Sequence, residues 1–360
     1  MCIVSTVQFS SFLVKTPRDY QLADLVFYMS QPRVANTSDP GTGKTLSACL
    51  YSYHRWTNDN LKSLWLQPKS LIRKNYDELL DCTPFQASDI CMYQGTPKER
   101  EALRQSDAKV FLTTSQTFAN EWTFLPSFGL LIIDEYHMMF KSDKSARTQE
   151  FYKFMKGCPY LVAMSGTMID GRLDTVYPWI QVVEPRYYGT YNGFLGQHEL
   201  TDEYGKRIGW TNHQKISAIF ARHAIRRTFE QTYGPEAKVI VTELCEMSQK
   251  QRLAYDKFEK EAFLELEDKF LDGGLPGVHA IRCRQIMGHP ENVLGEAITT
   301  ERTGKDERLL IHLEDHKRNK KPLVIFTSLV PEQLRIVKLC QDEGFRVGLI
   351  NGSVSGTSRA

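Results

Sequence analysis

Ser38-Asp39-Pro40-Gly41-Thr42-Gly43-Lys44-Thr45 is the stretch that decides the fold of this 360-residue chain. Two glycines let backbone N–H groups turn inward around an anion, the lysine can meet outer phosphates, and the threonine hydroxyl can hold magnesium. A helix-compatible apolar run, 46–56, follows directly, so the phosphates would lie at a helix N-terminus, where negative charge is favoured. The stretch predicts a phosphate-binding loop, and the alternative is a glycine-rich turn that caps a helix without a ligand.

A short amphipathic helix is predicted upstream of this loop. Pro17 suits a first helical turn, and the apolar residues of 22–29 recur at helical spacing. Gln21 would lie near the start of this helix, and its amide can both donate to and accept from an adenine edge. Gln21 is therefore a candidate base reader, and a solvated helix glutamine is the alternative.

Downstream of the loop, apolar segments alternate with helical patterns. The predicted strands are 61–66, 90–93, 110–112, 130–133 and 160–163, with helices at 71–80 and 97–105. Strands that are apolar throughout and separated by helices indicate a parallel sheet covered on both faces, an α/β fold. Ligands of such sheets gather at the carboxyl ends of the strands, so the chemistry is expected there.

Polar groups follow four of these strands, at 67–70, 113–115, 134–137 and 165–167. A buried strand that ends in Asp-Glu is the companion that a phosphate-binding loop needs. Asp134 can hold magnesium, usually through water, and Glu135 can polarise the water that attacks a γ-phosphate. The alternative is that the two acids only solvate a strand end.

The pattern changes after residue 186, and helices then dominate. The segment 248–270 places Tyr255, Phe258, Ala262, Leu266 and Phe270 on one face of a predicted helix, and Gly-rich 273–277 ends it. A second α/β pattern follows, with helices near 306–317 and 331–343 and strands at 323–326 and 346–350. We therefore expect a first lobe at 1–185, a mainly helical intervening region at 186–303 and the first part of a second lobe at 304–360.

Composition excludes little. A net charge of +2, with 41% apolar and 24% charged residues, is ordinary for a globular protein and requires any nucleic-acid surface to be a local patch. The eight cysteines form no C-x-x-C pair, which predicts free thiols in a reducing cytoplasm and no structural zinc, even near His279, Cys283 and His289. No run approaches the ~18 apolar residues of a membrane span, so no membrane partner is expected.

The order of these motifs resembles the superfamily-two helicases and translocases, and within them the Swi/Snf-like branch. The matching segments are Tyr20-Gln21, the SDPGTGKT loop, QPKSL (67–71), LTTSQTF (112–118), DEYH (134–137) and SGT (165–167). Further landmarks are IRRT (225–228), Gln251 with Tyr255, RQIMGHP (284–290), Gly304-Lys305 and VIFTS (324–328). Ser38 fits this likeness, because helicase-type loops commonly carry a small residue where kinase and GTPase loops usually keep glycine.

The resemblance implies two RecA-like lobes that bind ATP and Mg²⁺ between them and move along DNA. The nucleotide would be held by Gln21, Pro40, Gly41, Thr42, Gly43, Lys44 and Thr45, and magnesium by Thr45 and Asp134. Lys44, Asp134 and Glu135 would be catalytic, and His137, Ser165, Gly166 and Thr167 would couple ATP state to movement. The DNA backbone would contact Lys69, Ser70, Thr113, Ser115, Thr327 and Ser328, polar and cationic types that carry no base information.

Two departures from the family pattern stand out. Tyr136 replaces a small residue of the DEAH-type box, and we expect it to alter packing rather than abolish hydrolysis. The late motifs of the second lobe, including the arginine that reaches the γ-phosphate, would lie beyond Gly352 and are absent from the 360 residues. Because such an arginine contributes roughly 10³ to 10⁵ in rate, these residues alone are expected to hydrolyse ATP poorly.

The short connections between the motifs resemble those of phage UvsW-type branch-migration helicases, which implies a monomeric motor that remodels double-stranded or branched DNA. Two other functions stay open, a translocase that displaces proteins from duplex DNA and a nucleotide-gated DNA clamp without efficient turnover. An RNA substrate is disfavoured because the 284–290 segment resembles DNA-tracking members.

Overall fold

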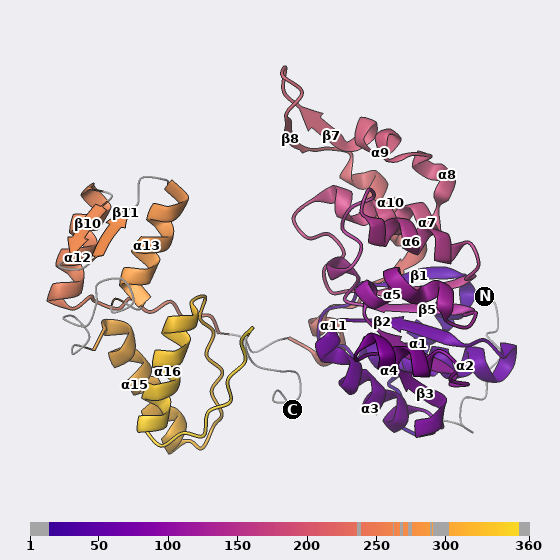
Figure 1. The fold of residues 1–360 in the computed structure, drawn as a ribbon, viewed down its shortest axis with the longest axis horizontal. Helices are drawn as coiled ribbons and strands as arrows, with labels where there is room; N and C mark the ends of the chain where they lie inside the picture. Colours follow the sequence, from indigo (N-terminus) through magenta and orange to yellow (C-terminus); the bar gives the residue numbers. More distant parts are fainter. Residues whose placement is uncertain are drawn as a thin grey trace. The chain divides into compact units, whose positions relative to one another are not determined.

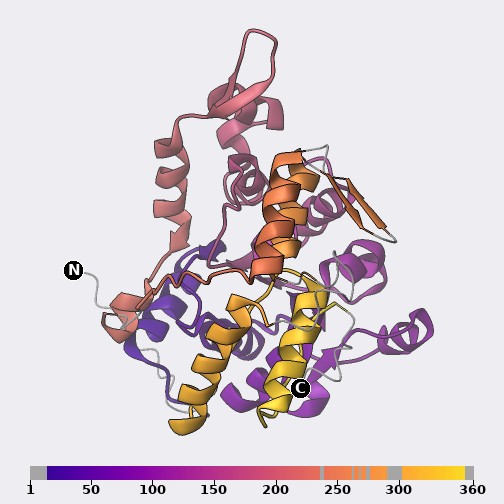
Figure 2. The ribbon, with the colours of Figure 1, turned by 90° about the vertical axis from the view of Figure 1, so that its left-hand side faces the viewer.

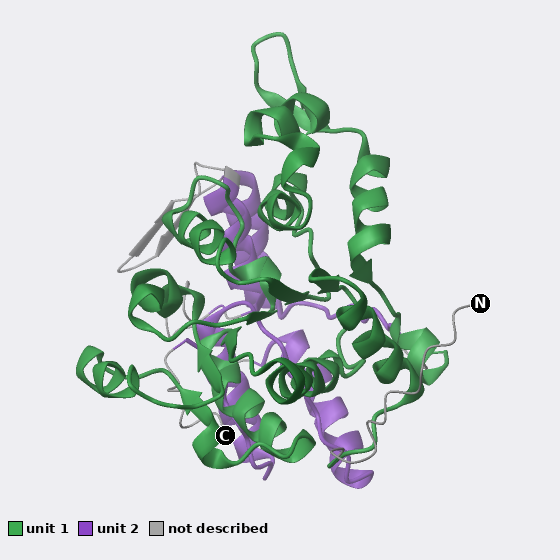
Figure 3. Ribbon diagram, turned by 90° about the vertical axis from the view of Figure 1, so that its right-hand side faces the viewer, with its two compact units in different colours: residues 1–237 green, residues 238–360 purple. Residues whose placement is uncertain are grey.

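The computed structural model describes residues 14–235, 239–261, 263–266, 269–272, 276–288, 290 and 302–352. Side chains within 262–276 are outside this description, as is His289. The chain divides into two compact units, residues 1–237 and 238–360, coloured separately in Figure 3.

Unit 1 is built on a seven-stranded sheet whose strand order is β3-β4-β2-β5-β6-β1-β9 and whose pairs are all parallel. The strands are β1 Arg33–Asn36, β2 Ser63–Leu66, β3 Ile90–Met92, β4 Val110–Thr113, β5 Leu130–Asp134, β6 Tyr160–Met164 and β9 Ala224–Ile225. The predicted α/β class and the five predicted strands of this sheet are confirmed. The ends of β1, β5 and β6 are neighbours, which brings their loops to one edge.

Successive strand residues point to opposite faces, and both faces are apolar and covered by helices (Figure 1). Trp65 and Ile132 pack with α1 Asp19–Ser30, α2 Lys44–Asp59 and α3 Ile72–Cys82. Leu64 and Ile133 pack on the other face with α5 Ser115–Glu121, α6 Ala146–Met155, α7 Tyr177–Val183 and α10 His213–His223. The helix α4 Pro97–Leu103 connects β3 to β4.

An excursion leaves the sheet after α7 and returns to it. It contains α8 Pro185–Tyr188, α9 Tyr191–His198 and the antiparallel pair β7 Glu199–Thr201 and β8 Arg207–Trp210, which projects from unit 1 in Figure 2. The chain then runs through α10 to β9, which pairs with β1, and on to α11 Phe229–Tyr233. The sheet thus continues past residue 185, and the expected division into three segments stays a prediction.

Unit 2 contains α12 Gln249–Glu261, β10 Phe263–Leu266, β11 Lys269–Asp272, α13 Pro276–Gly288, α15 Gly304–Arg318 and α16 Val330–Asp342. The Gln251 amide donates to the Ile286 carbonyl at 2.7 Å, and the Phe258 ring stacks on His279 at 5.3 Å, so α12 packs on α13. The helices predicted near 306–317 and 331–343 are confirmed as α15 and α16.

Three sequence predictions in unit 2 are wrong. The helix predicted over 248–270 ends at Glu261, and β10 pairs antiparallel with β11, because apolar residues at adjacent positions of 263–271 do not keep a helical period. The segments 323–326 and 346–350 form no strand in the described part of the chain. Phe326 is 92% exposed there, and two short strands without a larger sheet are marginal.

The described helices include none that is both long and apolar enough to cross a membrane. Within the described ranges, no three His, Cys, Asp or Glu side chains group closely enough to hold a metal ion.

Candidate functional site

The loop between β1 and α2 has the geometry that its glycines predict. Gly41 and Gly43 have φ of 82° and 78°, a left-handed backbone that side chains rarely adopt, and α2 begins at Lys44. A Cβ on Gly43 would lie 2.4 Å from the Gln21 amide nitrogen, so a larger residue would displace the Gln21 side chain as well as strain the backbone. Ser38, at the position where the strict pattern has glycine, is not among the residues with positive φ and needs no glycine.

Lys44 reaches back across the loop. Its Nζ donates to the Ser38 carbonyl at 2.6 Å and to the Asp39 carbonyl at 3.0 Å. Burial lowers the pKa of Lys44, and the carboxylates of Glu135 and Asp134 partly oppose that shift. The ammonium is therefore placed close to the acidic pair that ends β5.

The acidic pair is held in two different ways. Asp134 Oδ2 accepts a hydrogen bond at 3.1 Å from Nδ2 of Asn75, a buried residue of α3 that also donates to Gln67 Oε1 at 2.6 Å. Glu135 has φ 55° and ψ 51°, a left-handed conformation that is strained for a residue with a side chain. Such strain persists where the surrounding structure imposes it, often at functional sites.

Contacts tie the three neighbouring strand ends together. His137, after β5, lies with Nδ1 2.8 Å from the Ser165 hydroxyl, after β6, and that hydroxyl accepts from the Thr167 backbone N–H at 3.1 Å. A Cβ on Gly166 would meet Pro40 Cδ at 3.1 Å, so the loop after β6 lies against the loop after β1. The predicted nucleotide, metal and coupling residues are thus brought to one edge of the sheet.

Gln21 is buried rather than solvated, so the simpler of its two interpretations fails. Its Nε2 donates to the Gly43 carbonyl at 3.2 Å, and its Oε1 accepts from the Arg18 backbone N–H at 2.9 Å. The structure thus gives the amide a role in holding the loop, and contact with an adenine stays a prediction.

The predicted DNA-binding residues are placed differently from one another. Lys69 and Ser70 are exposed after β2, and Ser115 is a mostly buried residue that begins α5. Thr113 is fully buried and donates to the Tyr93 carbonyl at 2.8 Å, an arrangement that supports packing rather than a surface contact. In unit 2, Ser328 is exposed and the Thr327 hydroxyl donates to the Glu332 carboxylate.

Sequence reasoning missed the segment that follows β9 as part of this site. The Arg227 N–H donates to the Ser38 hydroxyl at 3.0 Å, and its guanidinium pairs with buried Asp24 at 2.8 Å. The Phe229 N–H donates to Asp39 Oδ2 at 3.0 Å. The motif IRRT at 225–228 was a signal, but nothing in its spacing reveals that β9 joins the sheet next to β1.

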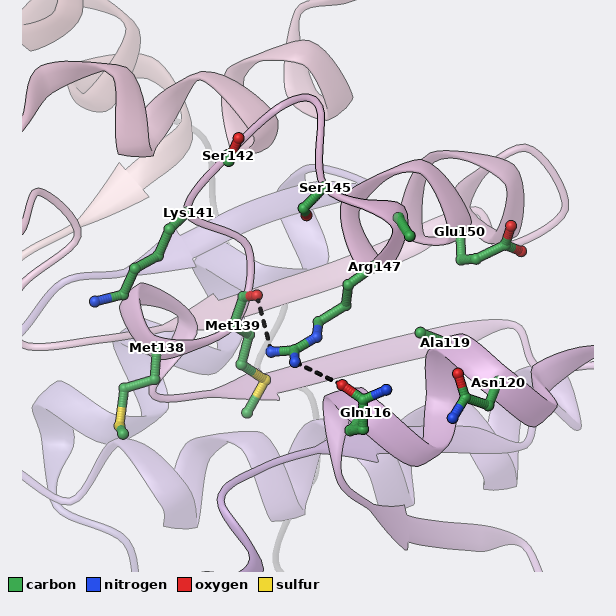
Figure 4. A pocket seen from close by; sticks show the side chains of 11 residues that line it. Gln116, Ala119, Asn120, Met138, Met139, Lys141, Ser142, Ser145, Arg147 and Glu150 are labelled. Carbon is green, nitrogen blue, oxygen red and sulfur yellow. Dashed lines mark hydrogen bonds between the residues drawn. The ribbon is translucent and has the colours of Figure 1, made fainter.

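A pocket of about 460 Å³ opens beside the DEYH segment (Figure 4). It is lined by α5, the 138–145 loop and the start of α6, and Arg147 points toward Gln116, whose Oε1 accepts a hydrogen bond at 2.8 Å. Within the described ranges Arg147 pairs with no carboxylate. This cation next to α5, the helix that begins at Ser115, was not predicted, since an arginine in the middle of a polar run has no distinctive pattern.

Comparisons with known proteins find similarity to helicases. Residues 20–176 match the family described as DEAD/DEAH box helicase. An uncharacterized ATP-dependent helicase of Mycoplasma genitalium is 24% identical over 298 residues, covering 81% of this chain and 28% of that protein. YwqA of Bacillus subtilis, which is named a putative ATP-dependent helicase/translocase, is 24% identical over 341 residues, covering 89% of this chain and 36% of that protein. The chain therefore spans about a third of the length of these relatives.

A solved structure shares the fold. The SWI2/SNF2 ATPase core of Sulfolobus solfataricus, in complex with dsDNA, matches with a TM-score of 0.53 and 19% identity over 92% of this chain and 71% of that chain. The chain is therefore similar to ATP-dependent helicases and translocases, with a match to the DEAD/DEAH box helicase family over residues 20–176 and the fold of a SWI2/SNF2 ATPase core.

Proposed function

We propose that this chain is the motor of an ATP-dependent translocase or helicase that acts on double-stranded DNA and remodels branched DNA. ATP dependence is supported by one observation: the loops that follow β1, β5 and β6 contact one another. The contacts are Pro40 with Gly166 and the hydrogen bond between His137 and Ser165. Such a motor requires three parts: a loop that binds phosphates, a pair of acids, and a second loop whose position changes with the state of the nucleotide.

The nucleotide phosphates would lie at the N-terminus of α2, where Lys44 exchanges the Ser38 and Asp39 carbonyls for phosphate oxygens. Thr45 and Asp134 offer the oxygen ligands that Mg²⁺ prefers, so the donor set fits this ion. When bound, Mg²⁺ neutralises charge that develops on the phosphates. Glu135 orients and polarises the attacking water. His137, which is hydrogen-bonded to Ser165, transmits a shift of Asp134 and Glu135 to the loop after β6.

The DNA backbone is proposed to contact Lys69, Ser70 and Ser115 on unit 1, with Arg147 as an added cation, and Thr327 and Ser328 on unit 2. Thr113 would support this surface from beneath, since its side chain is fully buried. All of these contacts would be to phosphates, so binding is expected to depend on salt and hardly on sequence. The solved relative in complex with dsDNA supports duplex DNA over RNA.

Salt titration tests the DNA part. Each phosphate neutralised on duplex DNA contributes about 0.9 to the slope of log affinity against log salt, so Lys69→Ala should flatten the slope by about one unit. Ser70→Ala is neutral and should weaken binding with an unchanged slope. Lys156→Ala is the matched control, because Lys156 is an exposed lysine between α6 and the amino end of β6, at the sheet edge opposite to the proposed path. A Lys69→Ala slope equal to that of the parent refutes the path.

A second titration tests the branched substrate. A four-way junction, a fork and a plain duplex are compared at each salt concentration, and the branched molecules should be bound or processed better at every one. Equal handling of all three removes the junction-remodelling proposal and favours the protein-displacing translocase.

Turnover separates a motor from a nucleotide-gated clamp. DNA should stimulate phosphate release by the motor, and Lys44→Ala should abolish that release, because the charge that meets the outer phosphates is lost. DNA binding that responds to ATP without stimulated phosphate release supports the clamp instead.

A further inference from the structure

Three consecutive carbonyl groups of the phosphate-binding loop accept hydrogen bonds from side chains. The Tyr233 hydroxyl donates to the Gly41 carbonyl at 2.9 Å, and the Tyr20 hydroxyl donates to the Thr42 carbonyl at 3.0 Å. The third donor is the Gln21 amide, which reaches the Gly43 carbonyl at 3.2 Å.

These bonds set the direction of the peptide groups. In a trans peptide the C=O and the N–H point to opposite sides, so a donor that fixes a carbonyl also fixes the N–H of the next residue on the other side. The Thr42 N–H, opposite the Gly41 carbonyl, donates to the Asp39 carbonyl within the loop at 3.4 Å. An anion-binding loop needs its N–H groups turned to a common centre before the anion arrives. The carbonyl donors are therefore placed to preorganise the loop for phosphates.

One donor comes from a distant part of the chain. Tyr233 is separated from Gly41 by 192 residues and lies on α11, outside the 20–176 family match. The guanidinium of Arg18 lies over its ring at 4.6 Å, and the Phe229 ring is 4.7 Å away, centroid to centroid. The phenol is thus held in place by contacts that do not involve its hydroxyl.

The hydroxyl of Tyr20 keeps its proton and stays a donor. Burial is the largest cause of the raised pKa of Tyr20, and the neighbouring Tyr233 hydroxyl adds to it. The hydroxyls of Tyr20 on α1 and Tyr233 on α11 therefore each donate a hydrogen bond to a different carbonyl of the loop.

We propose that Tyr233 is a positioning residue for the phosphate-binding loop, acting with Tyr20 by fixing the direction of the two peptide groups that follow Gly41 and Thr42. The inference rests on the proposed function, since it concerns the loop that binds the nucleotide. Nucleotide affinity would then depend on α11, the last helix of unit 1, which ends at Tyr233.

The test is ADP binding by the whole chain, without DNA. Tyr233→Phe removes only the hydroxyl and keeps the ring between Arg18 and Phe229. Losing one such hydrogen bond should weaken ADP affinity about fivefold. The Tm without nucleotide should not change. Tyr20→Phe should behave alike, and Tyr204→Phe, at an 87% exposed tyrosine of the β7–β8 turn, should bind ADP as the parent does.

Three results overturn the inference in distinguishable ways. Parental ADP affinity in Tyr233→Phe, with binding lost in Lys44→Ala, removes the positioning role and leaves the proposed function intact. A fall in ADP affinity that comes with a fall of several degrees in Tm assigns Tyr233 to folding. If the parent chain binds no ADP, the proposed function itself fails. Weaker ADP binding at unchanged Tm supports the positioning role.

Discussion

Asn75→Ala is expected to raise the Mg²⁺ requirement of ATP hydrolysis. Asn75 is 1% exposed, and its Nδ2 donates to Gln67 Oε1 at 2.6 Å and to Asp134 Oδ2 at 3.1 Å. Asn75 therefore fixes the position of the carboxylate that is proposed to hold the metal. A hydrogen bond to a charged group is worth about 1.5–3 kcal/mol. That range corresponds to roughly 10- to 100-fold in affinity, the size of effect typical when a group that orients a metal ligand is lost.

The assay is a Mg²⁺ titration of phosphate release at fixed ATP, and the midpoint should rise at least about tenfold. Asn58→Ala is the control, because Asn58 is an exposed amide near the end of α2. ADP binding without Mg²⁺ reports whether the loop of the variant is intact, since Asn75 does not touch that loop. A parental Mg²⁺ midpoint in a variant that still binds ADP refutes the metal role of Asp134.

Glu135→Gln should keep ATP binding and stop hydrolysis, measured as bound ATP that persists; failure to bind ATP would instead mark Glu135 as a metal or structural group. Tyr136→Phe should raise the free energy of unfolding by about 1 kcal/mol in denaturant titration, because the buried hydroxyl has no partner among the described residues, and a destabilised variant would contradict this. Burial lowers the pKa of Lys44, so its ammonium is lost at a lower pH than an ordinary lysine's, and ADP affinity should fall as pH rises toward that lowered pKa. Titration from about pH 7 to about pH 10 should show this fall in the parent and a flat curve in Lys44→Arg, whose guanidinium stays charged.

The sheet and the geometry of most of the candidate site could be predicted because short-range rules govern them. Apolar runs flanked by helices specified the parallel strands, and Gly41 and Gly43 stand where the backbone turns left-handed. The contribution of 224–233 could not be predicted in the same way, since β9 is only two residues long and its pairing with β1 is a long-range event. The hydrogen bonds from Arg227 to Ser38 and from Phe229 to Asp39 follow from that pairing.

The errors in unit 2 have a common physical cause. The pattern at 323–326 is that of a buried strand, but a strand forms only when a partner supplies its hydrogen bonds. Phe326 is 92% exposed in this structure, so propensity alone did not decide its state. Thr113 illustrates the converse, because a polar residue at a strand end can be fully satisfied by a neighbouring carbonyl.

The position of β9 at the edge of the sheet has a consequence for anyone who would cut this protein into smaller pieces. A fragment that stops at residue 176 or 185 would expose the whole backbone edge of β1, a template for intermolecular strand pairing and precipitation. It would also remove the N–H donors of Arg227 and Phe229. A soluble fragment that binds nucleotide should therefore extend through residue 235. The segment between α7 and β9 can be kept or shortened, but it must remain as a covalent connection, because β9 has to reach β1.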